Sequence, residues 1–339
     1  MKRQRLTTAT ATFPAFHFHQ LALCALLAAT APAAFAQTAF PSQPLRFIVA
    51  TAPGGGLDLF SRLLAKELTA RSGQQVVVEN RPGAGTTIAS NFVARAKADG
   101  YTILLNTSAL AISPALYDKL PYDTVRDLEP VTMGASAPNV LVVHPSLPVK
   151  SVKDLLALAK TRANRGDPML YGSGGSGTNS HLAAALMFEM AQIRVVQVPY
   201  KSGSLATVDV IAGQVPGFID AVSSLRSHLA SGKLRALAVS SPQRSAAAPG
   251  LPTIAESGVP GYESMQWYGL LLPAGAPPDL IAWLHRETTA LLRAAPFKER
   301  LASDGMDVVA NTPDEFAAMI KADIAKWTKL IKAIGLSPT

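Results

Sequence analysis

A glycine-rich segment, Ala52-Pro53-Gly54-Gly55-Gly56-Leu57-Asp58, follows an apolar stretch and precedes a helical pattern. Its three glycines allow a tight turn and leave their backbone N–H groups unshielded by side chains. The following helix adds unpaired N–H groups and the positive end of its dipole. Together these features predict an anion site that needs no arginine. The alternative is a tight turn in which Asp58 serves only as a first-turn charge or cap.

A second glycine-rich segment, Gly172-Ser173-Gly174-Gly175-Ser176-Gly177, leads into Thr178-Asn179-Ser180-His181. A dinucleotide site would also need an acidic residue about twenty positions further on, where the chain has Val198-Pro199-Tyr200. A phosphate-binding P-loop fails because Thr178 stands where lysine is required. The segment therefore predicts a second anion-binding helix terminus with added hydroxyl and amide donors, or simple helix capping by Thr178 or Ser180.

Two single residues are further candidates for ligand contact. His181 can act as a ligand donor or a general base, or it can hydrogen-bond locally in the first helical turn. Asp220 ends an apolar strand, where α/β folds place ligand contacts. An aspartate would repel a bound carboxylate, so Asp220 must hold water, contact a hydroxyl or amine of the solute, or face away.

Signals for catalysis or metal binding are missing from the sequence. It contains no G-x-S-x-G or H-E-x-x-H motif. Beyond residue 36 the histidines are His144, His181, His228 and His285, and no two have metal-ligand spacing. We therefore expect no catalytic residue, no metal, no cofactor and no enzymatic activity.

The first 36 residues have the layout of a secretory signal peptide. Lys2, Arg3 and Arg5 precede an apolar stretch over residues 21–33, and Ala34-Phe35-Ala36 supplies the small-x-small cleavage pattern. The apolar stretch is too short to span a bilayer core of about 30 Å. Cys24 would be the acylated residue of a lipoprotein, but Leu23 precedes it where a small residue is needed. We predict cleavage after Ala36 and a periplasmic protein.

The composition of the exported part excludes several classes of protein. Removing three cationic residues changes the net charge from +8 to 8 − 3 = +5, with 31 − 3 = 28 Lys and Arg against 23 Asp and Glu. These charges are scattered along the chain, whereas nucleic-acid binders cluster them on one face, so no nucleic-acid partner is expected. Cleavage also removes the single cysteine, which excludes disulfides and thiolate sites. About 300 residues exceed one comfortable core, so two lobes are expected.

Strand, turn and helix repeat along the chain, which predicts an α/β fold with mainly parallel sheets. Strands are expected at residues 45–50, 76–79, 101–105, 140–143, 169–171, 195–198, 217–220 and 234–239. Helices are expected at 59–70, 86–98, from Ser151 onward, 180–190, 207–212, 278–294, 297–304 and 313–334, with a loop rich in proline and glycine before residue 278. The chain is expected to leave the first lobe and later return to it. This gives lobe 1 as residues 37–141 plus 240–339 and lobe 2 as residues 142–239, and the two crossings suit a hinge.

From about Pro41 to Gly335 the sequence resembles the Bug proteins, also called the TctC family. These are extracytoplasmic receptors related to tripartite tricarboxylate transporters. Matching segments are Pro53-Gly54-Gly55-Gly56 with Asp58, Val78-Glu79-Asn80-Arg81-Pro82-Gly83-Ala84-Gly85, Asp99-Gly100-Tyr101-Thr102, Pro114-Ala115-Leu116-Tyr117, Leu120-Pro121-Tyr122-Asp123, Val198-Pro199-Tyr200-Lys201, Gly232-Lys233-Leu234-Arg235-Ala236-Leu237-Ala238-Val239 and Pro260-Gly261-Tyr262.

The resemblance implies a two-lobed periplasmic-binding-protein fold with two interlobe crossings. It also implies that a small carboxylate solute lies between the first glycine loop and the second-lobe Gly-Thr-x-Ser-His loop. Carried over by position, and with Asp58 added from the first loop, the expected ligand-binding residues are Gly55, Gly56, Asp58, Thr107, Ser108, Gly177, Thr178, Ser180, His181 and Asp220. The implied partners are the membrane subunits of a tripartite transporter or, for a signalling adaptor, a sensor kinase. A monomer is expected.

The sequence departs from the family pattern at two places. Leu57 stands where the family usually has threonine, and Ala109-Leu110-Ala111-Ile112 replaces a more polar stretch. Both changes predict a more apolar pocket, and hence a solute with a hydrophobic or aromatic body and one carboxylate.

Overall fold

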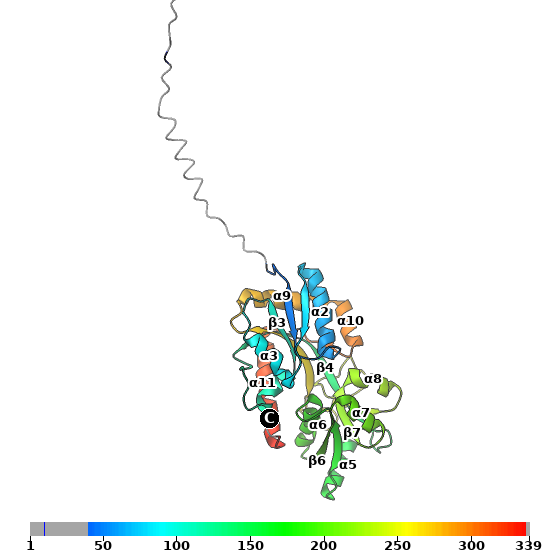
Figure 1. Ribbon diagram of the computed structural model, residues 1–339. Helices are drawn as coiled ribbons and strands as arrows, with labels where there is room; N and C mark the ends of the chain where they lie inside the picture. Colours follow the sequence, from blue (N-terminus) through cyan, green and yellow to red (C-terminus); the bar gives the residue numbers. More distant parts are fainter. Residues whose placement is uncertain (1–9, 11–39, 337–339) are drawn as a thin grey trace, which may run out of the picture. The chain divides into compact units, whose positions relative to one another are not determined.

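The predicted repeat of strands and helices forms in the computed structural model, which describes residue 10 and residues 40–336. The predicted signal peptide, residues 1–36, lies outside the described residues apart from Thr10, and so do Cys24 and Ala36. Residues 40–336 form one unit, drawn in colour in Figure 1.

The strands of this unit form one continuous hydrogen-bonded arrangement in the order β2-β1-β3-β9-β4-β7-β5-β6, and β10 and β8 also pair with β4. Their bounds are β1 Leu45–Val49, β2 Val76–Asn80, β3 Thr102–Thr107, β4 Leu128–Val143, β5 Met169–Ser173, β6 Val195–Pro199, β7 Gly217–Ala221, β8 Arg235–Val239, β9 Met265–Pro273 and β10 Asp307–Val308. β1 pairs parallel with β2 and β3, and β5 pairs parallel with β6 and β7. β9 and β4 run antiparallel to their neighbours, so each sheet is mixed.

The long strand β4 belongs to both sheets. Residues 128–138 pair with β9, and residues 139–143 pair with β7 and β8. We call the sheet of β1, β2, β3, β9, β10 and the start of β4 the first lobe, and the sheet of β5–β8 with the end of β4 the second lobe. Figure 1 shows the two groups of strands joined through β4.

The chain returns from the second lobe directly beside β4. The Ser240 N–H donates to the Asn139 carbonyl at 2.9 Å, and the Asn139 N–H donates to the Ser240 Oγ at 3.0 Å. The two crossings therefore lie side by side, as a hinge requires. The lobe limits at residues 141/142 and 239/240 stay a prediction.

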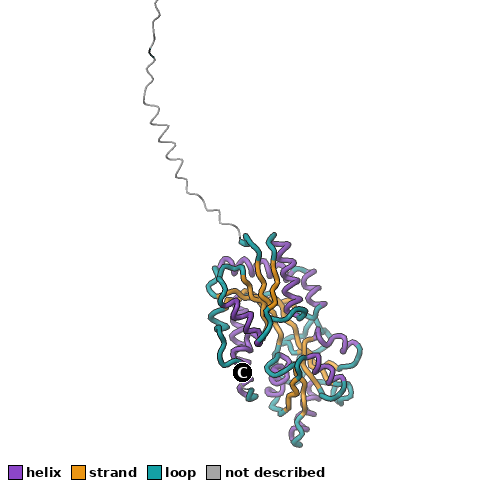
Figure 2. The backbone as a smooth tube through the Cα atoms, viewed as in Figure 1, coloured by secondary structure: helices purple, strands orange, loops and turns teal. Residues whose placement is uncertain are grey.

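The helices cover both faces of the sheets, as Figure 2 shows in purple. Their bounds are α2 Gly56–Ser72, α3 Thr87–Ala94, α4 Ala109–Leu116, α5 Val152–Asn164, α6 Asn179–Met190, α7 Gly203–Ile211, α8 Val222–Ala230, α9 Pro278–Arg293, α10 Ala295–Ser303 and α11 Pro313–Ala333, with a 3-10 turn at Ala84–Thr86. The helix expected from Ser151 onward is confirmed, and the Ser151 hydroxyl caps it by accepting from the Asp154 N–H. Among the described helices, none is both long and apolar enough to cross a membrane.

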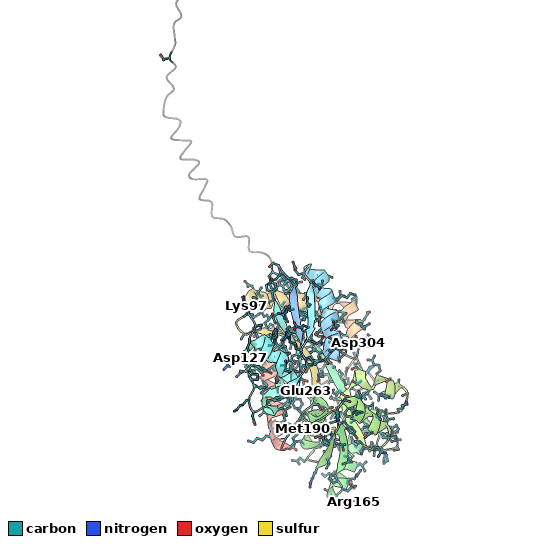
Figure 3. All side chains as sticks on the ribbon, viewed as in Figure 1. Lys97, Asp127, Arg165, Met190, Glu263 and Asp304 are labelled. Carbon is teal, nitrogen blue, oxygen red and sulfur yellow. The ribbon has the colours of Figure 1, made fainter. Side chains whose placement is uncertain are left out.

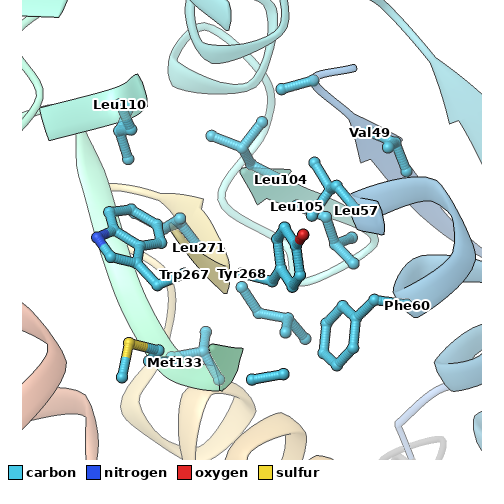
Figure 4. Close-up of a cluster of buried hydrophobic side chains, with 14 of the residues drawn as sticks. Val49, Leu57, Phe60, Leu104, Leu105, Leu110, Met133, Trp267, Tyr268 and Leu271 are labelled. Carbon is cyan, nitrogen blue, oxygen red and sulfur yellow. The ribbon is translucent and has the colours of Figure 1, made fainter. Parts of the chain in front are cut away.

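The sequence patterns missed four strands and helices. β9 and the two-residue β10 lie where no strand was expected, and α4 and α8 are short helices directly after strand ends. β9 has a glycine in its middle and a proline at its end, which weakens a strand pattern. Figure 4 shows that the β9 side chains Trp267, Tyr268 and Leu271 lie in the first-lobe core.

Burial of apolar side chains gives each lobe its own core. One cluster fills the first lobe around β1, β3 and β9, and two smaller clusters lie on the second-lobe sheet. In Figure 3, Lys97 marks the first lobe and Arg165 marks the far end of the second lobe. The strands β1 and β3 of the first lobe and β5, β6 and β7 of the second carry their following loops toward the junction of the lobes. A ligand site of an α/β fold is expected at such strand ends.

Candidate functional site

The first glycine loop joins β1 to α2 and is held from behind by Asp58. The Asp58 carboxylate is buried and accepts hydrogen bonds from the Gly54 N–H at 2.9 Å, Arg62 Nε at 3.0 Å and Asn80 Nδ2 at 2.9 Å. Burial acts to raise the pKa of Asp58, but the bonds from Arg62, Gly54 and Asn80 outweigh it and lower the pKa. These contacts favour the alternative in which Asp58 fixes the turn, and direct contact with a ligand stays a prediction.

The start of α2 keeps the character of an anion site. Gly55 is the N-cap residue, and no side chain accepts a hydrogen bond from the first helical turn. Uncapped N–H groups at a helix start are available to an anion. The first loop therefore retains the donors that the sequence predicted.

Thr107 ends β3, Ser108 follows it as the N-cap residue of α4, and both lie next to β9. Thr107 is the register partner of Tyr268, and the Ser108 hydroxyl donates to the Gln266 Oε1 at 3.0 Å. The Thr107 Oγ1 accepts from the Ala109 N–H at 3.2 Å. Both residues are buried, so these predicted site residues hold the β3–α4 turn beside the two β9 side chains.

Tyr268 is a site residue that the sequence analysis missed. A Cβ added to Gly56 would lie 2.4 Å from the Tyr268 hydroxyl, so this hydroxyl lies directly against the first glycine loop. The ring packs against Phe60 with centroids 6.0 Å apart, as in Figure 4. Only the pairing of β9 with β3 brings Tyr268 here, and that long-range pairing left no signal in the local sequence.

The second glycine loop, between β5 and α6, is braced by its own side chains. The Gly174 N–H donates to the Ser180 Oγ at 2.9 Å, and the Thr178 hydroxyl donates to the Gly175 carbonyl at 2.7 Å. Thr178 also caps α6 by accepting from the His181 N–H. The capping alternative is therefore confirmed for Thr178, and ligand contact by Thr178 and Ser180 stays a prediction.

His181 makes a local hydrogen bond at the start of its helix, which was the alternative to a role as ligand donor or general base. Its Nδ1 accepts from the Gly177 N–H at 3.0 Å, so in the neutral ring the proton is on Nε2. Burial lowers the pKa of His181 to about 4. At neutral pH the ring is uncharged and offers only an N–H donor. It lines a cavity of about 730 Å³ together with Tyr171, Phe188 and Arg194.

The lobes touch where the second loop meets α4. A Cβ on Gly177 would lie 2.7 Å from the Leu116 Cδ1, so the loop packs closely against the end of α4. The Asn139 Nδ2 donates to the Asn179 Oδ1 at 2.7 Å, which ties the crossing strand to the start of α6. These contacts join the element after Thr107 and Ser108 to the second glycine loop.

Asp220 lies at the end of β7 and is partly buried. Its Oδ1 accepts from the Ala221 N–H at 2.8 Å, and a Cβ added to Gly203 would lie 2.4 Å from its Oδ2. Burial raises the pKa of Asp220 to about 6. Burial and the negative charge of Asp220 together raise the pKa of Tyr268 to about 12.

In the second lobe, the loops after β5 and β6 lie against each other. A Cβ on Gly174 would lie 3.0 Å from the Gly203 N and 3.3 Å from the Ser180 Oγ. Beside Asp220 lies a cavity of about 390 Å³, and its lining residues are Gly203, Ser204, Thr207, Val208, Asp220, Ser224 and His228.

The apolar departures from the family pattern lie in the core. Leu57 is 2% exposed, and Leu110 and Ala111 are 0% exposed, within the first-lobe cluster. Their burial stabilises the core of this lobe, so apolar residues at these positions do not require an apolar ligand pocket. The prediction of a solute with an apolar body therefore loses these residues as support and stays a prediction.

The chemistry available at this site is hydrogen bonding. Its groups are backbone N–H donors, hydroxyls, a neutral imidazole N–H and one carboxylate. Within residues 40–336, no group of three or more His, Cys, Asp and Glu residues could hold a metal ion. Such a set of groups suits the binding and orientation of a small polar solute.

Comparison with known proteins agrees with this geometry. Residues 60–336 match the family model described as the tripartite tricarboxylate transporter family receptor, TctC. Protein BugT of Bordetella pertussis (strain Tohama I) is 34% identical over 319 residues, which cover 93% of this chain and 97% of BugT.

Two solved structures extend the similarity to the fold. R. palustris Rpa4515 with adipate has 33% identity and a TM-score of 0.75, and the match covers 88% of this chain and 100% of that one. MatC from Rhodopseudomonas palustris with bound malate has 26% identity and a TM-score of 0.70, covering 86% of this chain and 100% of that one. The fold, the paired glycine loops and these matches show that the chain belongs to the Bug/TctC family of solute-binding receptors.

Proposed function

We propose that this protein is a periplasmic receptor that captures a small carboxylate between its two lobes for a tripartite tricarboxylate-type uptake system. The observation that carries the proposal is the uncapped start of α2 with the Tyr268 hydroxyl against it, together with the contact that brings the second glycine loop at Gly177 against the end of α4. The adipate and malate bound by the two structural relatives support a carboxylate as the solute. The signal-peptide pattern of residues 1–36 supports the periplasmic location.

The first lobe supplies most of the groups for the carboxylate. The uncapped start of α2 offers N–H donors and a positive dipole end. The Tyr268 hydroxyl lies against the same loop and stays protonated at neutral pH, because its pKa is raised to about 12. A protonated hydroxyl can donate to a carboxylate oxygen. The carboxylate is therefore held without a cationic side chain.

The second lobe completes the site when the lobes close. The adjacent crossings at Asn139 and Ser240 act as the hinge, and the Leu116–Gly177 contact marks where the moving surfaces meet. A ligand that contacts both lobes binds the closed form better and shifts the population toward it. Closure then presents a single shape to the membrane subunits of the transporter.

A thermal-shift panel tests the proposal on ligand-stripped protein. Succinate, malate, adipate, citrate and benzoate are each added at increasing concentration, with glucose and putrescine as uncharged and cationic controls. A bound solute stabilises the folded protein by RT ln(1 + [L]/Kd), or about 2.7 kcal/mol at a hundredfold excess over Kd. At least one carboxylate should raise the melting temperature. Stabilisation by glucose or putrescine alone would contradict the proposal.

The same panel separates solute classes. Stabilisation by benzoate but not by succinate, malate, adipate or citrate supports a solute with an aromatic body and one carboxylate. Stabilisation by the di- and tricarboxylates alone would contradict a solute with an aromatic body and one carboxylate. The solute with one carboxylate and an apolar or aromatic body stays the prediction, although the position of Leu57 and Leu110 in the core removes their support for it.

A further inference from the structure

One face of α6, a helix of the second lobe, is buried against the first lobe. Leu182 and Ala185 are 0% and 6% exposed, and both belong to the apolar cluster that fills the first-lobe core. Leu186 is partly buried and packs against apolar clusters of both lobes. The spacing i, i+3 and i+4 places these three side chains on one face of the helix. The helix that follows the second glycine loop is therefore anchored in the other lobe.

The first-lobe partner of this face is the C-terminal half of α11. This helix packs on α4 and β4 and also contacts α6. Leu330 of α11 lies in the same apolar cluster as Leu182, and Leu330 and Leu186 line one cavity of about 570 Å³. We define the α6–α11 seam as Leu182, Ala185 and Leu186 on α6 together with Leu330 and Ala333 on α11.

The α6–α11 seam is loosely packed. A second cavity, the one of about 730 Å³ that His181 lines, also lies between α6 and the end of α11. Glu189 of α6 and Ala333 of α11 line both cavities, so the two helices meet between two open spaces. Atoms that line an open space lose dispersion contacts on that side. The seam therefore holds the lobes together less strongly than a filled core would, and a change in one side chain alters its strength.

The helix α6 connects the seam to the second glycine loop. Thr178 at the end of this loop caps α6, and the His181 ring in the first turn accepts from the Gly177 N–H. A Cβ on Gly177 would meet Leu116 at the end of α4, and α4 itself packs on α11. The loop contact and the seam therefore exist in the same arrangement of the lobes, in which the second glycine loop lies against the first lobe.

We propose that the α6–α11 seam sets the solute affinity by holding the second glycine loop against the first lobe, without contact with the solute. Leu186 and Ala333 are then positioning residues. This inference rests on the proposed function, in which the solute binds the closed form. The apparent Kd equals the intrinsic Kd divided by the fraction of protein in the binding-competent form. A weaker seam therefore weakens the binding of every solute by the same factor, and a stronger seam tightens it.

Isothermal titration calorimetry with malate and adipate on ligand-stripped protein tests the seam. Leu186→Ala removes apolar contact with both lobes and should weaken the binding of both acids by the same factor, about fivefold. Leu156→Ala is the matched control, because Leu156 on α5 is also partly buried but packs against the second-lobe cluster alone. This control should keep both Kd values within about twofold of wild type, since it leaves the fraction of closed protein unchanged.

Ala333→Leu makes the opposite change, because its longer side chain adds apolar contact where α6 and α11 meet between the two cavities. The binding of both acids should become at least about twofold tighter. Ala325→Leu is its control, since Ala325 is an exposed residue of α11 that lines neither cavity. A substitution that only damaged the fold would not tighten binding.

Energy transfer between dyes on the two lobes supplies a readout that does not depend on affinity. Beyond residue 36 the chain has no cysteine, so Lys97→Cys and Arg165→Cys place one dye on each lobe, at the positions labelled in Figure 3. Without solute, the transfer efficiency of Leu186→Ala should lie further from the malate-saturated value than that of the wild type. The efficiency of Ala333→Leu should lie closer to it.

The controls separate the possible outcomes. Kd values and transfer efficiencies that are the same in Leu186→Ala and Leu156→Ala would overturn the role of the seam and leave the carboxylate receptor intact. Weaker binding in Ala333→Leu than in Ala325→Leu would overturn it as well. If no acid of the thermal-shift panel binds the wild type, the proposed function itself fails.

Discussion

At the residue scale, the partly buried carboxylate of Asp220 carries a cost in stability. Its pKa in the folded protein is about 6, above the ordinary value of 3.8, because burial disfavours the charged form. The folded state therefore binds this proton more tightly than the unfolded state does. The penalty is missing below about pH 3.8, grows as the pH rises toward 6, and stays constant above pH 6.

Asp220→Asn should therefore stabilise the free protein at pH 8, because asparagine carries no charge to bury. The gain should be at most about 3 kcal/mol. Urea denaturation at pH 8 and at pH 3.5 measures the difference between variant and wild type. The gain should shrink at the lower pH, where the wild-type carboxyl is protonated. A variant that is less stable by the same amount at both pH values would contradict this assignment.

The sequence allowed the local hydrogen bonds of the site residues to be predicted, but not their contacts with distant parts of the chain. Thr178 and His181 both make the local bonds that their position at a helix start allows. Tyr268 could not be found, since its place beside Gly56 depends on β9 pairing with β3. Local spacing carries no information on a contact between residues that are 212 positions apart in the chain (268 − 56 = 212).

At the element scale, most strands and helices could be predicted from the periodicity of apolar residues, because an apolar run between glycine turns has few alternative secondary structures. The long strand β4 is the main exception. Pro130 and Pro138 lie within it, and both argue against a strand when the sequence is read alone. Register shifts near Pro130 allow the first proline to fit beside β9. Only residues 140–143 carried a clear strand pattern.

The contact between the second glycine loop and α4 gives a prediction for Gly177. This residue has φ +75°, and a Cβ added to it would lie 2.7 Å from the Leu116 Cδ1. Gly232 has φ +70° but no atom within 4 Å, so it is a matched control. Both alanine variants should lose about 1 kcal/mol from the left-handed backbone, and Gly177→Ala should lose a further 1–3 kcal/mol or so from overpacking.

Urea denaturation of the two glycine variants measures that difference. Adding Leu116→Ala to Gly177→Ala should recover part of the extra loss, because it removes the side chain that the new Cβ meets. Equal losses in Gly177→Ala and Gly232→Ala would show that the loop does not pack against α4 in solution.

At the scale of the whole molecule, two sheets share β4 and the chain returns beside it. This arrangement leaves the loops after β1 and β3 facing those after β5, β6 and β7. Under the proposed function, ligand capture follows from a change in the angle between the lobes rather than from a change within either sheet. The sequence predicted two lobes from chain length and from the positions of the crossing strands. Which loops would meet came only from the family resemblance.

Binding of malate by wild-type and Gly56→Ala protein, measured by isothermal titration calorimetry, tests the central claim most directly. The new Cβ would lie 2.4 Å from the Tyr268 hydroxyl and must displace it from the first glycine loop. Gly250→Ala is the control, because no atom lies within 4 Å of its Cβ position. The account predicts at least tenfold weaker binding in Gly56→Ala and a Kd within about twofold of wild type in Gly250→Ala. Wild-type affinity in a folded Gly56→Ala protein would contradict it.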